Sequence, residues 1–248
     1  MTVFLHPDQV AGSALADRYL QADRSGRVPW VLANMVSTVD GAAVIDGRST
    51  ALGGSEDRRV FQVIRSVADV ILVGAATVRA ERYGAPRLTA ELRERRSGAG
   101  RNPVPRVAVV SGRLDLDLGS SLFAEHRPYV LTTEEGAESA SDELRGSADV
   151  LACGSGRIDP EAAISLLAER GAGIILSEGG PSLNHQLLSA DLLDEFCLTL
   201  DPSLAGGEAG RIIRGEGPSS VHRMTLAHAG LAPDGVLFLR YLRSREDG

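Results

Sequence analysis

Short apolar segments typical of buried β-strands alternate with amphipathic helical patterns along most of the chain. The candidate strands lie at residues 30–36, 70–73, 106–110, 129–131, 150–153, 174–177 and 196–200. Strands that are apolar at consecutive positions are typical of a sheet that is covered on both faces. The pattern therefore predicts an α/β fold, in which helices flank a mainly parallel central sheet.

The helices between these strands have recognisable ends. Ser55 can cap a helix whose apolar face includes Ile64. Asp159 followed by proline predicts the start of another helix, and Gly171 predicts its end. A third helix is expected at residues 182–189, after a Gly-Gly-Pro turn.

Both ends of the chain depart from this alternation. Residues 1–28 are typical of a peripheral helix and connector, so we expect an N-terminal extension and then a single globular domain at residues 29–248. Two strand-like runs, at 223–229 and 236–242, flank a Pro-Asp-Gly turn and predict a closing antiparallel hairpin. Residues 90–105 are rich in Arg, Gly and Pro and are expected to form an exposed loop.

The charged residues exclude several functions. All 26 basic residues are arginine, which excludes a Walker phosphate loop, a Schiff-base enzyme and a pyridoxal enzyme, since each needs a lysine amine. The net charge of −7 gives no positive field that would attract nucleic acid. Neither a membrane-spanning run nor a secretory signal pattern is visible. We therefore expect a cytoplasmic protein that acts on a small molecule, without nucleic acid or a membrane as partner.

Several common site motifs are absent from the sequence. Cys153 and Cys197 lie singly in apolar runs and are expected to be buried. The five histidines lack zinc-like spacing, so no metal site is expected. A Gly-x-Ser-x-Gly elbow is missing, and the glycines at 154–156 lack the third glycine of a Rossmann fingerprint. A cofactor would have to bind in another way.

The segment after the strand at 174–177 is suited to binding an anion. Gly179 and Gly180 let the backbone approach a ligand closely, and Pro181 begins a helix whose first amides remain free. An ordinary strand-to-helix turn is the alternative interpretation.

Two further strand ends carry similar residues. Gly74, Ala75 and Thr77 follow the second candidate strand, and Ser111 and Arg113 follow the third. The carboxyl ends of parallel strands meet at one edge of a sheet, where open α/β folds bind their ligands. Together with the Gly-Gly-Pro turn, these residues predict a nucleotide-binding crevice.

The first candidate strand leads into Ser37, Thr38 and Asp40. An aspartate before a glycine is most often a plain turn residue. Alternatively, the strand delivers all three side chains to the crevice, where a partly dry Asp40 carboxyl with a raised pKa would donate a proton.

In this order, the motifs resemble those of the pyrimidine reductase family of riboflavin biosynthesis, whose fold is that of dihydrofolate reductase. The resemblance covers about residues 30–242. It rests on the Ser-x-x-Asp-Gly motif at 37–41 and on the segments 72–78, 178–183, 193–195 and 201–207.

The resemblance implies an NADPH-dependent reductase of the 5-amino-6-(5-phosphoribosylamino)uracil reductase type. Hydride from the nicotinamide would reduce an open-ring ribosylamino group to a ribitylamino group, and a homodimer is also implied. We expect Asp40 to protonate the substrate and Arg113 to meet the 2′-phosphate of the cofactor. The expected cofactor contacts are Gly74, Ala75, Thr77, Glu81, Ser111, Arg113, Gly179, Gly180, Pro181, Ser182 and Leu183. The expected substrate contacts are Ser37, Ser49, Arg65, Arg87 and Glu178.

One segment departs from the family. Residues 81–88 replace the family pattern Asp-Asp-Pro-x-Leu-Thr-x-Arg, which touches both cofactor and substrate, so the pocket is expected to be altered there. The sequence contains neither the His-x-Glu nor the Cys-x-x-Cys motif of the zinc deaminase domain that many members carry, so we expect reduction only. Two alternatives remain open: a reductase of dihydrofolate or another pterin on the same fold, and a catalytically silent nucleotide-binding module.

Overall fold

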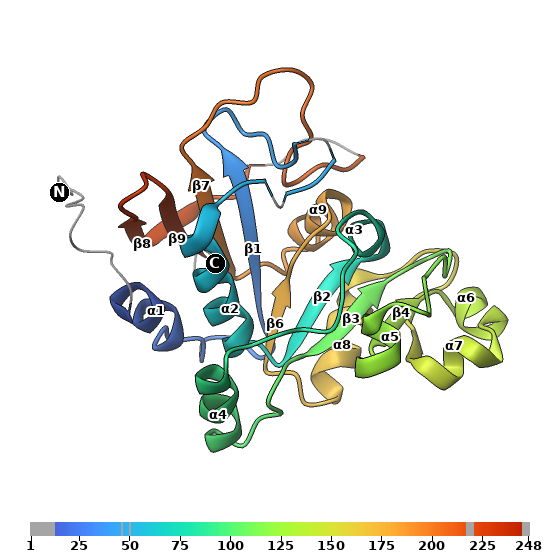
Figure 1. Cartoon of the computed structure of the whole chain (residues 1–248). Coiled ribbons are helices and arrows are strands. Elements are labelled where there is room, and N and C mark those ends of the chain that lie inside the picture. Colours follow the sequence, from blue (N-terminus) through green and yellow to red (C-terminus); the bar gives the residue numbers. More distant parts are fainter. Residues whose placement is uncertain (1–12, 46, 50, 217–220, 245–248) are drawn as a thin grey trace.

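The strands predicted from the sequence form one sheet in the computed structural model of the protein, which describes residues 13–45, 47–49, 51–216 and 221–244. The strands are β1 (Trp30–Thr38), β2 (Val70–Gly74), β3 (Arg106–Val110), β4 (Tyr129–Thr132), β5 (Asp149–Ala152), β6 (Ile174–Ser177), β7 (Glu195–Asp201), β8 (Met224–Leu231) and β9 (Leu237–Arg243). Across the described residues their order in the sheet is β5-β4-β3-β2-β6-β1-β7-β9-β8 (Figure 1).

Most of the sheet is parallel. β1 lies between β6 and β7 and pairs in parallel with both, and parallel pairing continues from β6 through β2, β3 and β4 to β5. β9 is antiparallel to β7, and β8 is antiparallel to β9. The predicted mainly parallel sheet with a closing antiparallel hairpin is therefore confirmed.

Helices flank this sheet (Figure 1). They are α1 (Ser13–Leu20), α2 (Gly54–Val67), α3 (Ala75–Ala80), α4 (Ala90–Gly98), α5 (Ser121–His126), α6 (Glu134–Ser139), α7 (Asp142–Ser147), α8 (Pro160–Glu169) and α9 (Pro181–Ser189). Leu32 of β1 belongs to one buried cluster with Ile64 of α2, whereas the adjacent Val31 belongs to a second cluster with Leu167 of α8. Because successive strand residues point to opposite faces, both must be apolar, which explains the unbroken apolar runs.

The helix starts agree only partly with the sequence. Asp159 caps α8 as predicted, because its carboxylate accepts the Glu161 amide at 2.9 Å, and α8 ends just before Gly171. The predicted Ser55 cap of α2 is wrong, because the helix begins two residues earlier, at Gly54, and Ser55 already lies in its first turn. Its N-cap is Gly53, at φ 85°, which provides no side-chain cap.

The predicted exposed loop at 90–105 is also wrong, since α4 occupies residues 90–98. Thr89 caps this helix by accepting the Leu92 amide. Arg96 is only 3% exposed, and its guanidinium donates to the carbonyls of Ser66 and Asn102 at 2.8 Å each. The buried face of α4 therefore contains an arginine. Because that position is not apolar, the sequence of α4 lacks the apolar periodicity by which a helix is predicted.

The segment assigned to an N-terminal extension contributes to the interior of the domain. Tyr19 of α1 is 1% exposed, and Arg24 pairs with the buried Glu195 of β7 at 2.9 Å. Glu195 also accepts bonds from Arg240 at 2.7 Å and from the Trp30 indole at 3.0 Å. Burial raises the pKa of Glu195, but Arg240 and Arg24 outweigh burial and hold its pKa below the ordinary value.

We expect Glu195→Gln to destabilise the fold by about 3–5 kcal/mol at pH 7, because it leaves two buried guanidiniums without their carboxylate. Since the folded pKa is lowered, this stabilisation is complete above the unfolded pKa of about 4.3 and is lost as the pH falls through the folded value. Urea unfolding at pH 7 and at acidic pH would measure both effects. Glu169→Gln on the exposed end of α8 is the control; equal losses in the two variants would contradict the prediction.

Candidate functional site

A cleft of about 910 Å³ opens at the carboxyl edge of the parallel strands. Its walls come from β1, one face of α2, helix α3, the segment 81–87 and the turn 178–181. Helices α3 and α9 begin at this edge, directly after β2 and β6 (Figure 1). The crevice predicted at the strand ends is therefore present.

The turns after β2 and β6 touch each other. The Gly74 amide donates to the Gly179 carbonyl at 2.8 Å. A Cβ atom on Gly74 would lie 3.6 Å from the Gly180 nitrogen, and one on Gly180 would lie only 2.7 Å from Thr77 Oγ1. Gly179 has φ 84°, which favours glycine. The structure thus brings together the Gly74–Thr77 and Gly179–Gly180 segments, as the sequence suggested.

Both helices that begin at these turns have free N-terminal amides. The N-caps of α3 and α9 are Gly74 and Gly180, and neither residue has a side chain that could cap the helix. The uncapped amides and the positive ends of the helix dipoles favour an anion such as a phosphate. Thr77 and Pro181 line the cleft beside them.

A buried polar network below the cleft fixes the Gly-Gly turn, and the sequence analysis did not single it out. The Gly179 amide donates to Ser177 Oγ at 3.3 Å, and that hydroxyl donates to Asn184 Oδ1 at 2.9 Å. Asn184 Nδ2 then donates to the Ile212 carbonyl at 3.0 Å. Ser177 and Asn184 are both fully buried. The signal for Ser177 was a hydroxyl at the end of an otherwise apolar strand.

Arg65, Glu178 and Tyr83 form a closed cluster on the cleft wall. Arg65 holds both carboxylate oxygens of Glu178 at 2.7 Å, and the Tyr83 hydroxyl donates to Glu178 Oε2 at 2.6 Å. The guanidinium also lies 4.0 Å from the Phe61 ring centre. Burial, and then the Glu178 charge, raise the pKa of Tyr83, so its hydroxyl stays protonated. Tyr83 belongs to the segment that departs from the family, and the sequence analysis gave it no role.

Burial lowers the pKa of Arg65, but Glu178 outweighs burial and raises it above the ordinary value. Arg65 and Glu178, both expected to contact substrate, therefore line the cleft as an ion pair. The substrate phosphate would have to compete with a bidentate carboxylate for Arg65, so the exposed arginines of the cleft are better placed to bind it.

Ser49 and Glu81 also meet on the cleft wall. Glu81 Oε1 accepts the Ser49 amide at 2.8 Å and the Ser49 hydroxyl at 3.0 Å. Glu81 Oε2 is buried and has no hydrogen-bond partner among the described residues. An expected substrate contact and an expected cofactor contact thus share one hydrogen-bonded pair.

The environment predicted for Asp40 is wrong. Its carboxylate is exposed and accepts the Gly206 amide at 2.7 Å, the Ala205 amide at 3.1 Å and the Thr38 hydroxyl. The Thr38 hydroxyl and then these amides lower the pKa of Asp40 to about 2, whereas a proton donor needs a raised pKa. Asp40 is also not among the described residues that line the cleft. The geometry therefore supports the alternative, a turn residue that anchors a distant loop.

The remaining predicted residues lie in several environments. Arg87 is exposed and lines the cleft. Ser37 is buried, and Leu183 packs its side chain into the core. Ser111 is buried at the end of β3, where its Oγ accepts the Leu114 amide at 3.1 Å. Ala75 is buried in the core and is not among the described residues that line the cleft, whereas Ser182 and Arg113 are exposed but lie beyond its lining.

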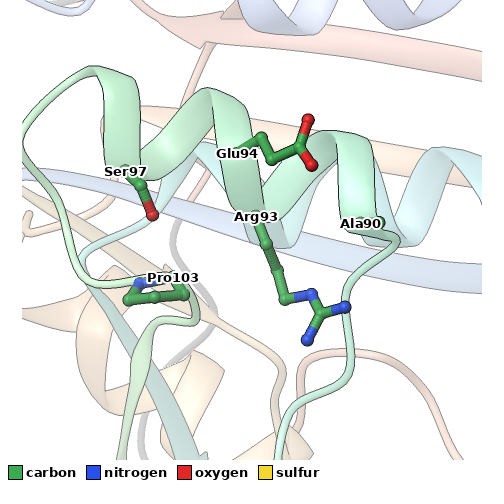
Figure 2. Close-up of a pocket in the computed structure, with 5 residues that line it drawn as sticks. All are labelled: Ala90, Arg93, Glu94, Ser97 and Pro103. Atoms are coloured by element: carbon green, nitrogen blue, oxygen red, sulfur yellow. The ribbon is translucent and has the colours of Figure 1, made fainter.

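A smaller hollow of about 370 Å³ lies between α4 and the segment that precedes β3 (Figure 2). Its labelled residues are Ala90, Arg93, Glu94, Ser97 and Pro103, and Figure 2 shows Glu94 pointing away from the others. The hollow shares no residue with the cleft. It therefore takes no part in the predicted site.

Other side chains and helices of the described chain suggest no further chemistry. Cys153 and Cys197 are both buried thiols, as predicted. Within the described ranges, no three His, Cys, Asp or Glu side chains gather in a way that could hold a metal ion. Nor does that part of the chain contain a helix long and apolar enough to cross a membrane.

Comparison with known families agrees with this geometry. The profile of the RibD C-terminal domain matches residues 29–238. The chain belongs to the RibD C-terminal domain family. The resemblance on the motifs at 37–41, 72–78 and 178–183 is therefore confirmed.

Two archaeal relatives carry the name 2,5-diamino-6-ribosylamino-4(3H)-pyrimidinone 5′-phosphate reductase. The Archaeoglobus fulgidus protein is 32% identical over 184 residues, covering 72% of this chain and 83% of the relative. The Methanothermobacter thermautotrophicus protein is also 32% identical, covering 76% of this chain and 85% of the relative.

Solved structures are also similar to this chain. A pyrimidine reductase-like protein from Corynebacterium diphtheriae has a TM-score of 0.78 and 27% identity, covering 88% of this chain and 93% of that one. A Thermotoga maritima protein, described as a deaminase and 5-amino-6-(5-phosphoribosylamino)uracil reductase, has a TM-score of 0.67 and 19% identity. That match covers 88% of this chain and 57% of the other, and it shows the fold alone.

We expect Gly180→Ala to weaken the binding of a nicotinamide nucleotide by about ten-fold or more, equivalent to at least ~1.4 kcal/mol. The new Cβ would lie 2.7 Å from Thr77 Oγ1, so the hydroxyl and the turn must shift. Fluorescence titration with NADPH would measure the change. Gly98→Ala in α4 is the matched control, because its Cβ would meet nothing within 4 Å. Equal NADPH affinity in both variants would place the anion site elsewhere.

Proposed function

We propose that the chain is an NADPH-dependent reductase of a ribosylamino-pyrimidine 5′-phosphate in riboflavin biosynthesis. The observation that carries the proposal is the contact between two uncapped helix N-termini at Gly74 and Gly180, which open onto a large cleft. The names of the archaeal relatives support a pyrimidine substrate. Membership of the RibD C-terminal domain family supports the same reaction class.

The cofactor-binding residues that we infer are those at the ends of β2, β3 and β6. The free amides after Gly74 and Gly180 would hold the diphosphate, with the Thr77 hydroxyl beside them. A Cβ on Gly180 would collide with Thr77. Because glycine has no Cβ, the main-chain groups of this turn remain accessible to a ligand. Ser111 and Arg113 would lie at the adenosine end. When bound, the nicotinamide supplies the hydride.

The substrate phosphate would bind to exposed arginines at the cleft. Arg58, Arg82 and Arg87 all line it and are exposed, and a guanidinium binds phosphate bidentately. Arg65 instead holds Glu178 in place. The phosphate role is therefore assigned to these three side chains.

The reaction delivers hydride to the ribose C1′ of an open-ring imine and a proton to the attached nitrogen. Three carboxyls line the cleft. Glu178 is held by Arg65, and Asp57 lies about 12 Å along α2 from Arg65, whereas Glu81 keeps one buried oxygen without a partner among the described residues. Ser49 orients Glu81 through its amide and hydroxyl. We therefore assign Glu81, and not Asp40, to handling the proton.

We expect loss of NADPH absorbance when the ribosylamino-pyrimidine phosphate is added to the protein. Reduction of dihydrofolate, but not of the pyrimidine phosphate, would favour the pterin alternative. NADPH binding without turnover of any of these compounds would favour a silent module. A homodimer and a cytoplasmic location are part of the proposal, and sedimentation would test the homodimer.

We expect Arg113→Ala to weaken NADPH binding by about ten-fold while leaving NADH binding unchanged, since only NADPH carries the 2′-phosphate. Parallel titrations with the two nucleotides would measure this. Arg93→Ala, on the hollow beside α4, removes the same charge away from the cleft and serves as the control. If NADPH and NADH affinities fall together, Arg113 does not contact the 2′-phosphate.

A further inference from the structure

One face of α2 presents three different side chains to the cleft. Asp57, Phe61 and Arg65 recur every four residues, so they lie on one side of the helix at intervals of about 6 Å. Arg65 is tied to Glu178 at the end of β6. Asp57 therefore lies about 12 Å further along the helix, with an aromatic ring between them.

The position of Asp57 is tightly constrained. Gly53 packs against it so closely that a Cβ on Gly53 would lie 2.5 Å from Asp57 Cγ. The Thr199 side chain of β7 is close enough to the Asp57 carboxyl to lower its pKa. The nearby Asp201 carboxylate accepts the Gly53 amide at 2.8 Å. The Asp57 carboxyl is thus held where the cleft, α2 and β7 meet.

Asp57 differs from the other two carboxyls of the cleft. Both oxygens of Glu178 accept from Arg65, and one also accepts from Tyr83. One oxygen of Glu81 accepts twice from Ser49. Burial raises the pKa of Asp57 above its ordinary value, and the Asp201 charge adds to this rise. Thr199 and Arg58 lower the pKa but do not offset burial, so the charge of the Asp57 carboxylate is poorly compensated. A pair of donors from a ligand would compensate it.

The two pyrimidines named for the family's reductases differ at the position that such a carboxyl would recognise. A 2-amino-4(3H)-pyrimidinone presents two adjacent donors, N3–H and the 2-amino N–H, which match the two oxygens of a carboxylate. Uracil presents N3–H between two carbonyl oxygens, and these acceptors would face the carboxylate oxygens unfavourably.

We propose that Asp57 is the specificity-determining residue that binds the 2-amino, N3–H edge of the substrate, so that this protein prefers 2-aminopyrimidinones over uracils. The inference rests on the proposed function and identifies the substrate class of the same cleft. Phe61 would lie beside the ring, and Arg65 with Glu178 would close the opposite end of this wall.

The test compares kcat/KM for 2,5-diamino-6-ribosylamino-4(3H)-pyrimidinone 5′-phosphate and 5-amino-6-(5-phosphoribosylamino)uracil, using NADPH. We expect the wild type to favour the 2-amino compound by about ten-fold or more. Asp57→Asn should remove or reverse that preference, because an amide offers one acceptor and one donor and therefore suits uracil. If this variant does not fold, Asp57→Ser provides the second test of the preference.

Two comparison variants separate this role from others. Glu81→Gln should slow both substrates together and leave their ratio unchanged. Asp142→Asn makes the same chemical change in the first turn of α7 and should alter neither rate nor ratio. A wild type without preference, an unchanged ratio in the Asp57 variants, or a ratio altered by Glu81→Gln would each overturn the inference.

A different result distinguishes failure of the proposed reductase function from failure of the Asp57 inference. If the wild type binds NADPH but reduces neither pyrimidine, the proposed function is wrong, and calorimetry of the two compounds then tests Asp57 directly. Tighter binding of the 2-amino compound that disappears in Asp57→Asn would still support its role, whereas equal binding of the two compounds would overturn it.

Discussion

The main-chain hydrogen bond from Gly74 to the Gly179 carbonyl, at 2.8 Å, joins the turns that follow β2 and β6, and the cleft is arranged around it. The bond forms because β2 and β6 are neighbours in the sheet and because neither turn carries a Cβ that would separate them. It joins the chain just before α3 to the chain just before α9, and Glu178, which pairs with Arg65, directly precedes Gly179. Anion binding and the charged wall of the cleft therefore both depend on one contact between backbones.

Much of this framework could be predicted from the sequence, because it depends on local properties. Strands that are covered on both faces need unbroken apolar runs, and close turns need glycine, so both leave a direct signal. The helix α4 left no such signal, because Arg96 fills its buried face and satisfies carbonyls from a distant segment. Gly53 as the cap of α2 was missed because Ser55, two residues further on, is the commoner type of cap.

In the candidate site, too, the sequence predicts the features that depend on local properties and misses those that depend on distant contacts. Thr77 and Gly180 were predicted to meet because both follow parallel strands. The environment of Asp40 depends on amides from residues 205–206, far along the chain, and no local pattern indicates that they would reach it. Tyr83 and Asp57 owe their surroundings to Glu178 and Thr199, respectively, so their importance emerges only from tertiary contacts.

The position of Arg24 limits how the protein can be shortened. A fragment cut to begin at the family boundary, residue 29, would retain every strand but would lose Tyr19 and one of the two guanidiniums that neutralise Glu195. The carboxylate would remain sealed between β1 and β9 with half of its counter-charge. Shorter versions made for crystallisation or fusion should therefore begin before α1, even though the family profile does not include that helix.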